Sequence, residues 1–346
     1  MAQTSLGRSR IAGVSTCVPS KLFDNLEDTA GFPKDEVRKV VAMAGVRQRY
    51  VVEGSMCSSD LCLHAARQLL AQLGWEPDTI DGLILVTQTP DYFLPSTSCL
   101  VHRDLGLSAQ CATFDVGLGC SGYPYGLWLA SMMLNSGMRR VLVLHGETPS
   151  LITSHEDRAT HLLFGDAGSA TALEFDDSAA PSHFCLHTDG TGYDDLIIHG
   201  GGFRERFPED RSRYYLQMDG AGLFNFTIQR VPALISDTLA LAHCAVEDVG
   251  YYVFHQSNQF MMKHLVKKCG LPAERAPIIL DRFGNCGGPS VPLTITQGVA
   301  PNGVNEPQTL MLLGYGVGLS WSSALVTIDP ATLLLHSSLS GTCVGV

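Results

Sequence analysis

The sequence predicts an α/β protein built from two halves that repeat the same order of strands and helices. Apolar runs of strand length, such as GLILVT, alternate with segments whose apolar residues recur at helical spacing. This alternation is typical of α/β units with a mainly parallel sheet. It extends to about residue 176 and resumes at about Gln217, after the irregular stretch 177–215. We therefore expect an N-terminal half, residues 1–176, and a C-terminal half, residues 177–346.

The elements of the first half follow from these patterns. Gly45 and Gly137 stand where a left-handed residue would end a helix. We expect helices at 34–44, 58–74 and 121–137, and strands at 10–18, 82–87, 114–116, 141–145 and after the turn 164–168. The loop TPDYFLPST carries Tyr92, Phe93 and Leu94 between two prolines, and we expect it to cover a pocket or to pack on a partner subunit.

The second half is expected to repeat this layout. Its helices are predicted at 221–242, 258–269 and from about Pro289, and its strands at 251–256, 309–316 and 318–328. The segment GGFRERFPEDRSRYY in the irregular stretch concentrates four arginines, which we interpret as a solvated loop.

The composition excludes several classes of protein. A net charge of −11 argues against nucleic-acid binding, and the low charged fraction of 16% favours a large interior or an oligomer. No uninterrupted apolar run reaches the roughly 18 residues of a membrane span, and the N-terminus lacks a long apolar signal region. The 11 cysteines include no CxxC pair, so we expect neither a disulfide framework nor a zinc site. A cytoplasmic protein is predicted.

Cys120 is the candidate nucleophile. It lies in DVGLGCSG, at the turn from a strand into a helix, with glycines on both sides. The positive end of the helix dipole favours a thiolate there, so we expect a lowered thiol pKa.

His255 and Asn285 are the candidate partners of this nucleophile. His255 follows a predicted strand in VFHQSN, and Asn285 lies between glycines in RFGNCGGPSVP, ahead of a helix. Such turns beyond strand ends are where α/β sheets present functional groups. A thiol with two nitrogen donors is equipped for acyl transfer.

The sequence resembles the β-ketoacyl-acyl-carrier-protein synthase III group of the thiolase-like superfamily. The motifs that carry the resemblance are DVGLGCSG, DRATHLLFGDAG, MDGAGLFNF, HQSN, GNCGGPSVP and GYGVGLSW, which together span nearly the whole chain. The resemblance implies a thiolase-like fold, with duplicated βαβαβαββ halves in five layers (αβαβα), and a homodimer. It implies no metal and no redox cofactor.

By this resemblance, Cys120 would accept an acyl group from coenzyme A or an acyl carrier protein. His255 and Asn285 would hold the carbonyl of a malonyl-type extender during its decarboxylation, and the backbone amides of Cys120 and Gly318 would form the oxyanion hole for the acyl group. The product would be a β-ketoacyl thioester.

The amide of Asn285 favours condensation over other reactions. It can donate a hydrogen bond to an enolate, whereas a carboxylate would repel it. Two alternatives stay open: an acyltransferase that moves an acyl or malonyl group from Cys120 to an alcohol or amine, and an inactive synthase-like partner subunit. Carbon dioxide release separates the first from condensation, and failure to form any acyl-enzyme would support the second.

Several further residues are expected to bind substrate. Arg47 and Arg158 match basic residues that hold the nucleotide of coenzyme A in the family, and Asn258 completes the HQSN motif. Phe260 stands where the housekeeping enzymes carry an arginine used in carrier docking, so Lys263, Lys267 and Lys268 are the alternative cations. Leu94 stands where the family often places an aromatic gate residue. These departures favour a starter other than acetyl in a specialised pathway, and no residue pattern specifies its chain length.

Overall fold

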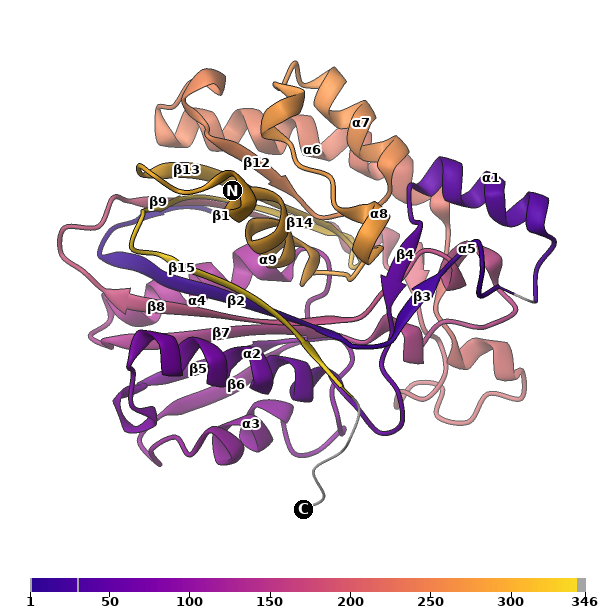
Figure 1. Ribbon diagram of the computed structural model, residues 1–346, viewed down its shortest axis with the longest axis horizontal. Coiled ribbons are helices and arrows are strands. Elements are labelled where there is room, and N and C mark those ends of the chain that lie inside the picture. Colours follow the sequence, from indigo (N-terminus) through magenta and orange to yellow (C-terminus); the bar gives the residue numbers. More distant parts are fainter. Residues whose placement is uncertain (1, 30, 341–346) are drawn as a thin grey trace.

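Two β-sheets form the centre of the protein, and helices cover them on both sides and fill the space between them (Figure 1). The computed structural model describes residues 2–29 and 31–340, so residues 1, 30 and 341–346 of the two expected halves lie outside the description. The layer order is helix, sheet, helix, sheet, helix. The predicted five-layer arrangement is therefore confirmed.

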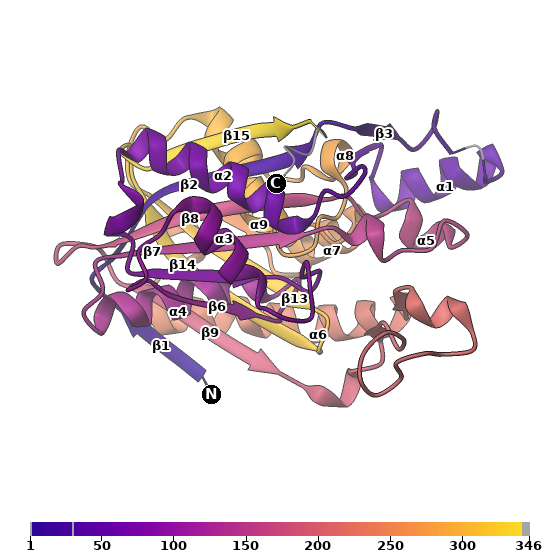
Figure 2. The same ribbon diagram turned by 90° about the horizontal axis from the view of Figure 1, so that it is seen from below.

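The first sheet follows the βαβαβαββ order. Its strands lie in the order β15-β2-β8-β7-β5-β6. The segment runs β2 (Ser9–Pro19), α2 (Ser58–Leu73), β5 (Gly82–Val86), α3 (Thr97–Leu105), β6 (Ala112–Val116), α4 (Gly122–Asn135), β7 (Arg140–Glu147) and β8 (Ala167–Phe175). A small annex of α1 (Lys34–Ala44), β3 (Leu22–Asp24), β4 (Gln48–Tyr50) and α5 (Arg158–His161) extends beyond one end of the sheets (Figure 2).

The second sheet repeats this order with one difference. Its strands lie in the order β1-β9-β14-β13-β12, and the segment runs β9 (Ser182–Thr188), α6 (Gly220–Ala242), β12 (Tyr251–Phe254), α7 (Gln259–Lys268), α9 (Ser290–Thr294), β13 (Gln308–Gly316) and β14 (Ser320–Ile328). Between α7 and α9 the described chain forms the short helix α8 (Leu280–Phe283) and no strand of the sheet. Two short strands, β10 (Leu196–Ile197) and β11 (Gln217–Met218), pair in the segment before α6.

The two terminal strands are exchanged between the sheets. β1 (Ala2–Leu6) pairs with β9 of the second sheet, and β15 (Leu333–Leu339) pairs with β2 of the first. A boundary at residue 176 separates β8 from β9, which lie in different sheets, but these terminal strands cross it. The sequence analysis predicted neither strand, and it also missed α3 and β9.

Local signals in the sequence placed most other elements. The predicted helix 34–44 is α1, and Gly45 ends it with a φ of 81°. Helix α6 begins where the side chain of Asp219 accepts hydrogen bonds from the amides of Ala221 and Gly222.

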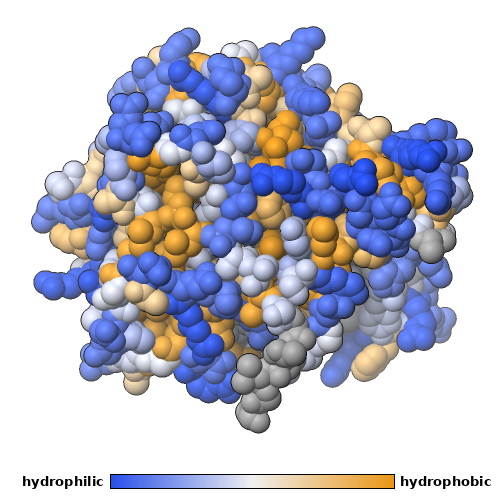
Figure 3. Space-filling view, viewed as in Figure 1, coloured by the Kyte–Doolittle hydropathy of each residue, from blue (hydrophilic) through white to orange (hydrophobic). Residues whose placement is uncertain are grey.

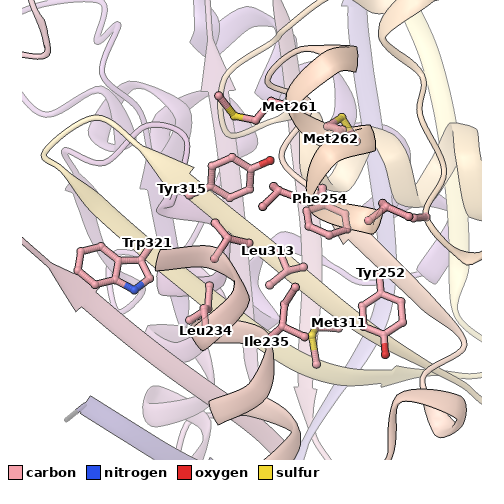
Figure 4. Packing of buried hydrophobic residues seen from close by; sticks show 14 of the residues in the cluster. Leu234, Ile235, Tyr252, Phe254, Met261, Met262, Met311, Leu313, Tyr315 and Trp321 are labelled. Carbon is pink, nitrogen blue, oxygen red and sulfur yellow. The ribbon is translucent and has the colours of Figure 1, made fainter. Parts of the chain in front are cut away.

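Helices α4 and α9 lie between the two sheets, and the apolar faces of both sheets pack on them. A second core fills the space between α6, α7 and the outer face of the second sheet, where Tyr252, Phe254, Leu313 and Tyr315 lie close together (Figure 4). On the outer surface, hydrophobic residues gather in separate patches among hydrophilic ones (Figure 3). These packed layers fix the strand ends where the candidate catalytic residues lie.

Candidate active site

Cys120 lies at the turn between β6 and α4, packed against the end of β13. The side chain is buried. A Cβ atom at Gly316 would lie 2.9 Å from the Cys120 Cβ and 3.0 Å from its Sγ, and Gly316 has a φ of 155°. Both the contact and the backbone conformation therefore require glycine at this position of the GYGVG motif.

The resting form of Cys120 is the thiol. Burial, together with the charge of Glu147, raises the pKa of the Cys120 thiol to about 12. Hydrogen bonds from the backbone amides of Val317 and of Cys120 itself lower this pKa but do not outweigh the burial. The lowered pKa predicted from the helix N-terminus is therefore wrong, and the thiol needs a base.

His255 follows β12 and is almost completely buried. Its Nδ1 lies 3.0 Å from the carbonyl oxygen of Gly287 and 2.9 Å from Oγ of Ser290. A carbonyl oxygen only accepts, so Nδ1 carries the ring proton of the neutral imidazole, and Nε2 is left with a lone pair. Burial lowers the pKa of His255 to about 4. The neutral ring can therefore accept a proton at Nε2.

Asn285 has a fixed orientation. Its Oδ1 accepts a hydrogen bond of 2.9 Å from the amide of Gly287, and its Nδ2 donates to the carbonyl of Ser257 at 3.3 Å. These two bonds fix the orientation of the side-chain amide, and one N–H of Nδ2 remains for another acceptor. A parallel β-bridge to Phe164 holds the backbone of Asn285 in place.

Short contacts bring the three segments together. The Tyr315 hydroxyl donates to the carbonyl of His255 at 3.2 Å, and the next residue, Gly316, touches Cys120. A Cβ at Gly288, three residues after Asn285, would lie 2.5 Å from the carbonyl oxygen of Gly119. The segments that carry Cys120, His255 and Asn285 thus meet around the end of β13.

The structure draws attention to an amide that sequence reasoning missed. The sequence analysis proposed the amide of Gly318 for the oxyanion hole, and the backbone amide of the residue before it, Val317, also favours negative charge on the Cys120 sulfur by lowering the thiol pKa. Oγ of Ser320 donates to the Val317 carbonyl at 2.8 Å and lies 2.6 Å from Oγ of Ser121. These bonds tie the β13–β14 turn to the start of α4. The glycines on both sides of Val317 were the only available signal.

The two arginines expected to bind substrate are both in ion pairs. Nε of Arg47 lies 2.8 Å from both carboxylate oxygens of Asp24, and Arg158 pairs with Glu36 of α1. Both arginine side chains are about half exposed, 47% and 41%. Both arginines lie in the annex beyond the sheets, and their ion pairs link its elements to one another.

The other three candidates for substrate binding lie outside the buried centre. Oδ1 of Asn258 accepts a hydrogen bond of 2.8 Å from the amide of Met261, so the side chain caps α7. Phe260 stacks on Phe224 with 5.8 Å between the ring centres. Leu94 is 84% exposed at the tip of its loop.

The described part of the chain contains neither a cluster of metal-ligating side chains nor a membrane-spanning helix. No group of three or more His, Cys, Asp or Glu residues in 2–29 and 31–340 could hold a metal ion. Within the same ranges, no helix has both the length and the apolar character needed to span a bilayer.

A buried thiol, a neutral histidine and an oriented amide on adjoining segments of a thiolase-like fold define a class of acyl-transferring enzymes that work through a cysteine. Comparison with known proteins identifies the family. Residues 114–190 match 3-oxoacyl-[acyl-carrier-protein] synthase III, and residues 239–328 match the C-terminal part of the same family. The chain is 33% identical over 339 residues to the beta-ketoacyl-[acyl-carrier-protein] synthase III of Rhodopirellula baltica, covering 91% of this chain and 97% of that one.

Solved structures give the same result. A 3-oxoacyl-(acyl-carrier protein) synthase from Burkholderia xenovorans superimposes with a TM-score of 0.94 at 41% identity, over 97% of this chain and 99% of that one. The priming β-ketosynthase of the R1128 polyketide pathway superimposes with a TM-score of 0.85 at 26% identity, over 94% and 98%.

The chain belongs to the 3-oxoacyl-[acyl-carrier-protein] synthase III family. It is an acyltransferase that condenses an acyl thioester with a malonyl thioester. The resemblance, the fold class and the reaction predicted from the sequence are therefore confirmed.

Proposed function

We propose that Cys120 carries the acyl group and that His255 and Asn285 promote the decarboxylation of the malonyl-type extender. The observation that carries this proposal is the fixed hydrogen bonding of the two nitrogen groups. His255 offers a lone pair at Nε2, and Asn285 offers one N–H, because their other atoms are held by Gly287, Ser290 and Ser257.

Loading begins with proton transfer from the Cys120 thiol to Nε2 of His255. The sulfur then forms a bond with the thioester carbonyl carbon, and the donor leaves as its thiolate, which takes a proton from water. The backbone amides of Cys120 and Val317 are suited to the oxyanion of this step, since both already interact with the sulfur. The imidazolium keeps the proton taken from Cys120.

Condensation uses the positive charge that the proton from Cys120 gives to His255. Loss of carbon dioxide from the extender leaves an enolate, and its oxygen accepts hydrogen bonds from Nδ2 of Asn285 and from protonated Nε2 of His255. The enolate carbon bonds to the acyl carbon, and the Cys120 sulfur leaves as a thiolate. It regains its proton from His255, which restores the resting site.

The substrates and the cellular setting are part of the same proposal. Coenzyme A or carrier-protein thioesters would be the donors, with no permanently bound cofactor. The exposed Lys263 and Lys267 of α7 are available to an acidic carrier protein, whereas Lys268 donates to the carbonyl of Ile228 at 2.8 Å. A reducing cytosol is supported by the buried free thiols, which include Cys17, Cys62, Cys185 and Cys286.

The apolar loop 92–94 supports a homodimer. Phe93 and Leu94 are 75% and 84% exposed in the single chain, and the Phe93 ring lies against the similarly exposed Phe203, so together they form an apolar patch of the kind that marks protein–protein contacts. In such a dimer, Leu94 would reach the partner's acyl pocket.

The test is a condensation assay with an acyl donor and malonyl thioesters of coenzyme A and of a carrier protein. We expect carbon dioxide and a β-ketoacyl product in equal amounts, and neither with the Cys120→Ala variant. Acyl transfer to an alcohol or amine without carbon dioxide would support the acyltransferase. Absence of any acyl-enzyme in the folded protein would support the inactive partner subunit.

A further inference from the structure

A buried pair of titratable side chains that the proposed mechanism does not use lies directly behind the catalytic groups. His145 and Glu147 are the last inward-facing residues of β7, in the same row as Val141 and Val143. The side chains are 0% and 6% exposed, and Nε2 of His145 lies 4.0 Å from Oε1 of Glu147. Neither ring nitrogen of His145 has a hydrogen-bond partner among the described residues.

This pair touches both turns that carry the catalytic residues. A Cβ at Gly288 would overlap the His145 ring, and a Cβ at Gly122 would lie 3.2 Å from its Cε1. A Cβ at Gly287 would lie 3.2 Å from Cγ of Glu147, and the carbonyl of Gly287 holds His255. The pair therefore lies between the turn that carries Cys120 and the turn that follows Asn285.

The carboxyl group of Glu147 is held by two donors. The amide of Gln88 donates to Oε1 at 2.9 Å, and the Thr89 hydroxyl donates to Oε2 at 3.2 Å. Both donors come from the segment after β5, next to Gly119. These two bonds therefore fix the position of the Glu147 carboxyl group.

We propose that Glu147, with His145 beside it, is a positioning residue for the condensation that governs how readily Cys120 releases its proton. This inference rests on the proposed role of Cys120 as nucleophile. A protonated Glu147 leaves the pair neutral and the thiolate undisturbed, whereas an ionised Glu147 opposes the negative sulfur through Coulomb repulsion in a site without water.

The titratable groups around Glu147 support this assignment. They are His145 on its own strand, Cys62 of α2, Cys120 before α4 and Asp166 before β8, and His255 in turn acts on His145. Burial raises the pKa of Glu147 to about 8, and Asp166 adds to the shift. Burial and the neighbouring His255 lower the pKa of His145 to about 3. At neutral pH the pair is therefore mostly an acid beside a neutral imidazole.

The test is the rate at which iodoacetamide alkylates Cys120, measured by mass spectrometry of the peptide that carries it. This reaction needs no acyl donor, so it does not depend on the condensation activity. At pH 9, Glu147→Gln is expected to react about tenfold faster than the parent, the effect of about one unit in thiol pKa. At pH 6, where Glu147 is protonated in the parent, the two rates should agree within about twofold.

Asp91→Asn is the matched control, because it changes another partly buried carboxyl group whose charge acts on neither Cys120 nor Glu147. Its ratio of rates at the two pH values should equal that of the parent. If Glu147→Gln does not fold, as judged by thermal melting, Glu147→Leu is expected to give the same pH-dependent increase. Equal rates of variant and parent at pH 9, or the same increase at both pH values, would overturn the proposal. Failure of acyl loading with this pH signature intact would contradict only the proposed function.

Discussion

Nδ1 of His255 donates a hydrogen bond to the carbonyl oxygen of Gly287 over 3.0 Å, and this bond determines which nitrogen of the ring faces the reaction. The Gly287 amide in turn donates to Oδ1 of Asn285 at 2.9 Å. One glycine therefore orients both nitrogen groups of the site. These bonds occupy Nδ1 of His255 and Oδ1 of Asn285. The Nε2 lone pair of His255 and one N–H of Asn285 therefore remain for substrate.

Ser290→Ala should impair the base without removing it. Oγ of Ser290 lies 2.9 Å from Nδ1 of His255 and accepts from the amide of Gln256 at 3.1 Å. Its loss leaves the buried Gln256 amide unpaired, so the free energy of unfolding should fall by about 1–3 kcal/mol. We expect kcat to fall about tenfold with little change in KM.

Thr294→Val is the control for Ser290→Ala. The Thr294 hydroxyl is also buried in α9 but donates only to the carbonyl of Ser290, at 2.7 Å. A similar loss of kcat in both variants would mean that the effect of Ser290 is merely structural.

Asn285→Asp should separate loading from decarboxylation. The carboxylate can still accept the hydrogen bond from the Gly287 amide, so the turn keeps its shape. It cannot donate to an enolate oxygen, and we expect decarboxylation to slow by about 10²-fold or more while acyl loading persists. Rates of carbon dioxide release and of acyl-enzyme formation measure the two steps. Condensation at the parental rate would contradict the role given to Asn285.

Gly288→Ala should disturb the contact between the two catalytic turns. The added Cβ would overlap the His145 ring and lie 2.5 Å from the carbonyl oxygen of Gly119. Backbone atoms cannot rotate away, so we expect a loss of about 1–3 kcal/mol in unfolding free energy and a lower kcat. Gly117→Ala is the matched control, because a Cβ at Gly117 meets no atom within 4 Å. Equal melting temperatures for the two variants would contradict this packing.

Glu147 should make the stability fall as the pH rises. Its pKa of about 8 in the folded state lies above the 4.5 of an unperturbed glutamate, so the folded state binds more protons between these values. The stabilising contribution is complete below about pH 4.5 and is lost as the pH rises through about 8. Urea unfolding at pH 5 and pH 8 should show the parent losing more stability over this range than Glu147→Gln. A parallel loss in both proteins would contradict the raised pKa.

Local signals explain which parts of the fold the sequence predicts. Gly45 and Gly137 act within one turn of the chain, and the turns around Cys120 and Asn285 carry their own glycines. The exchange of β1 and β15 between the sheets depends on pairing across more than 170 residues, such as Ala2 with Leu186, and no local pattern records it.

The same limit applies to the site. Cys120, His255 and Asn285 could be found because each follows a strand and stands beside a turn signal. The Val317 amide was placed one residue away, at Gly318, because a backbone group has no residue type of its own to mark its position. His145 and Glu147 could not be found, since they end a strand whose other residues look like ordinary core. The thiol pKa was misjudged because burial of Cys120, which depends on both sheets, outweighs the helix dipole.

The most direct test of the central claim is the intact mass of the protein after incubation with a panel of acyl thioesters of coenzyme A and of a carrier protein. We predict a mass increase equal to one acyl group, confined to a preferred chain length, absent in Cys120→Ala and reversed when a malonyl thioester is added. A folded protein that gains no mass from any donor, or that gains the same mass in Cys120→Ala, would contradict the account.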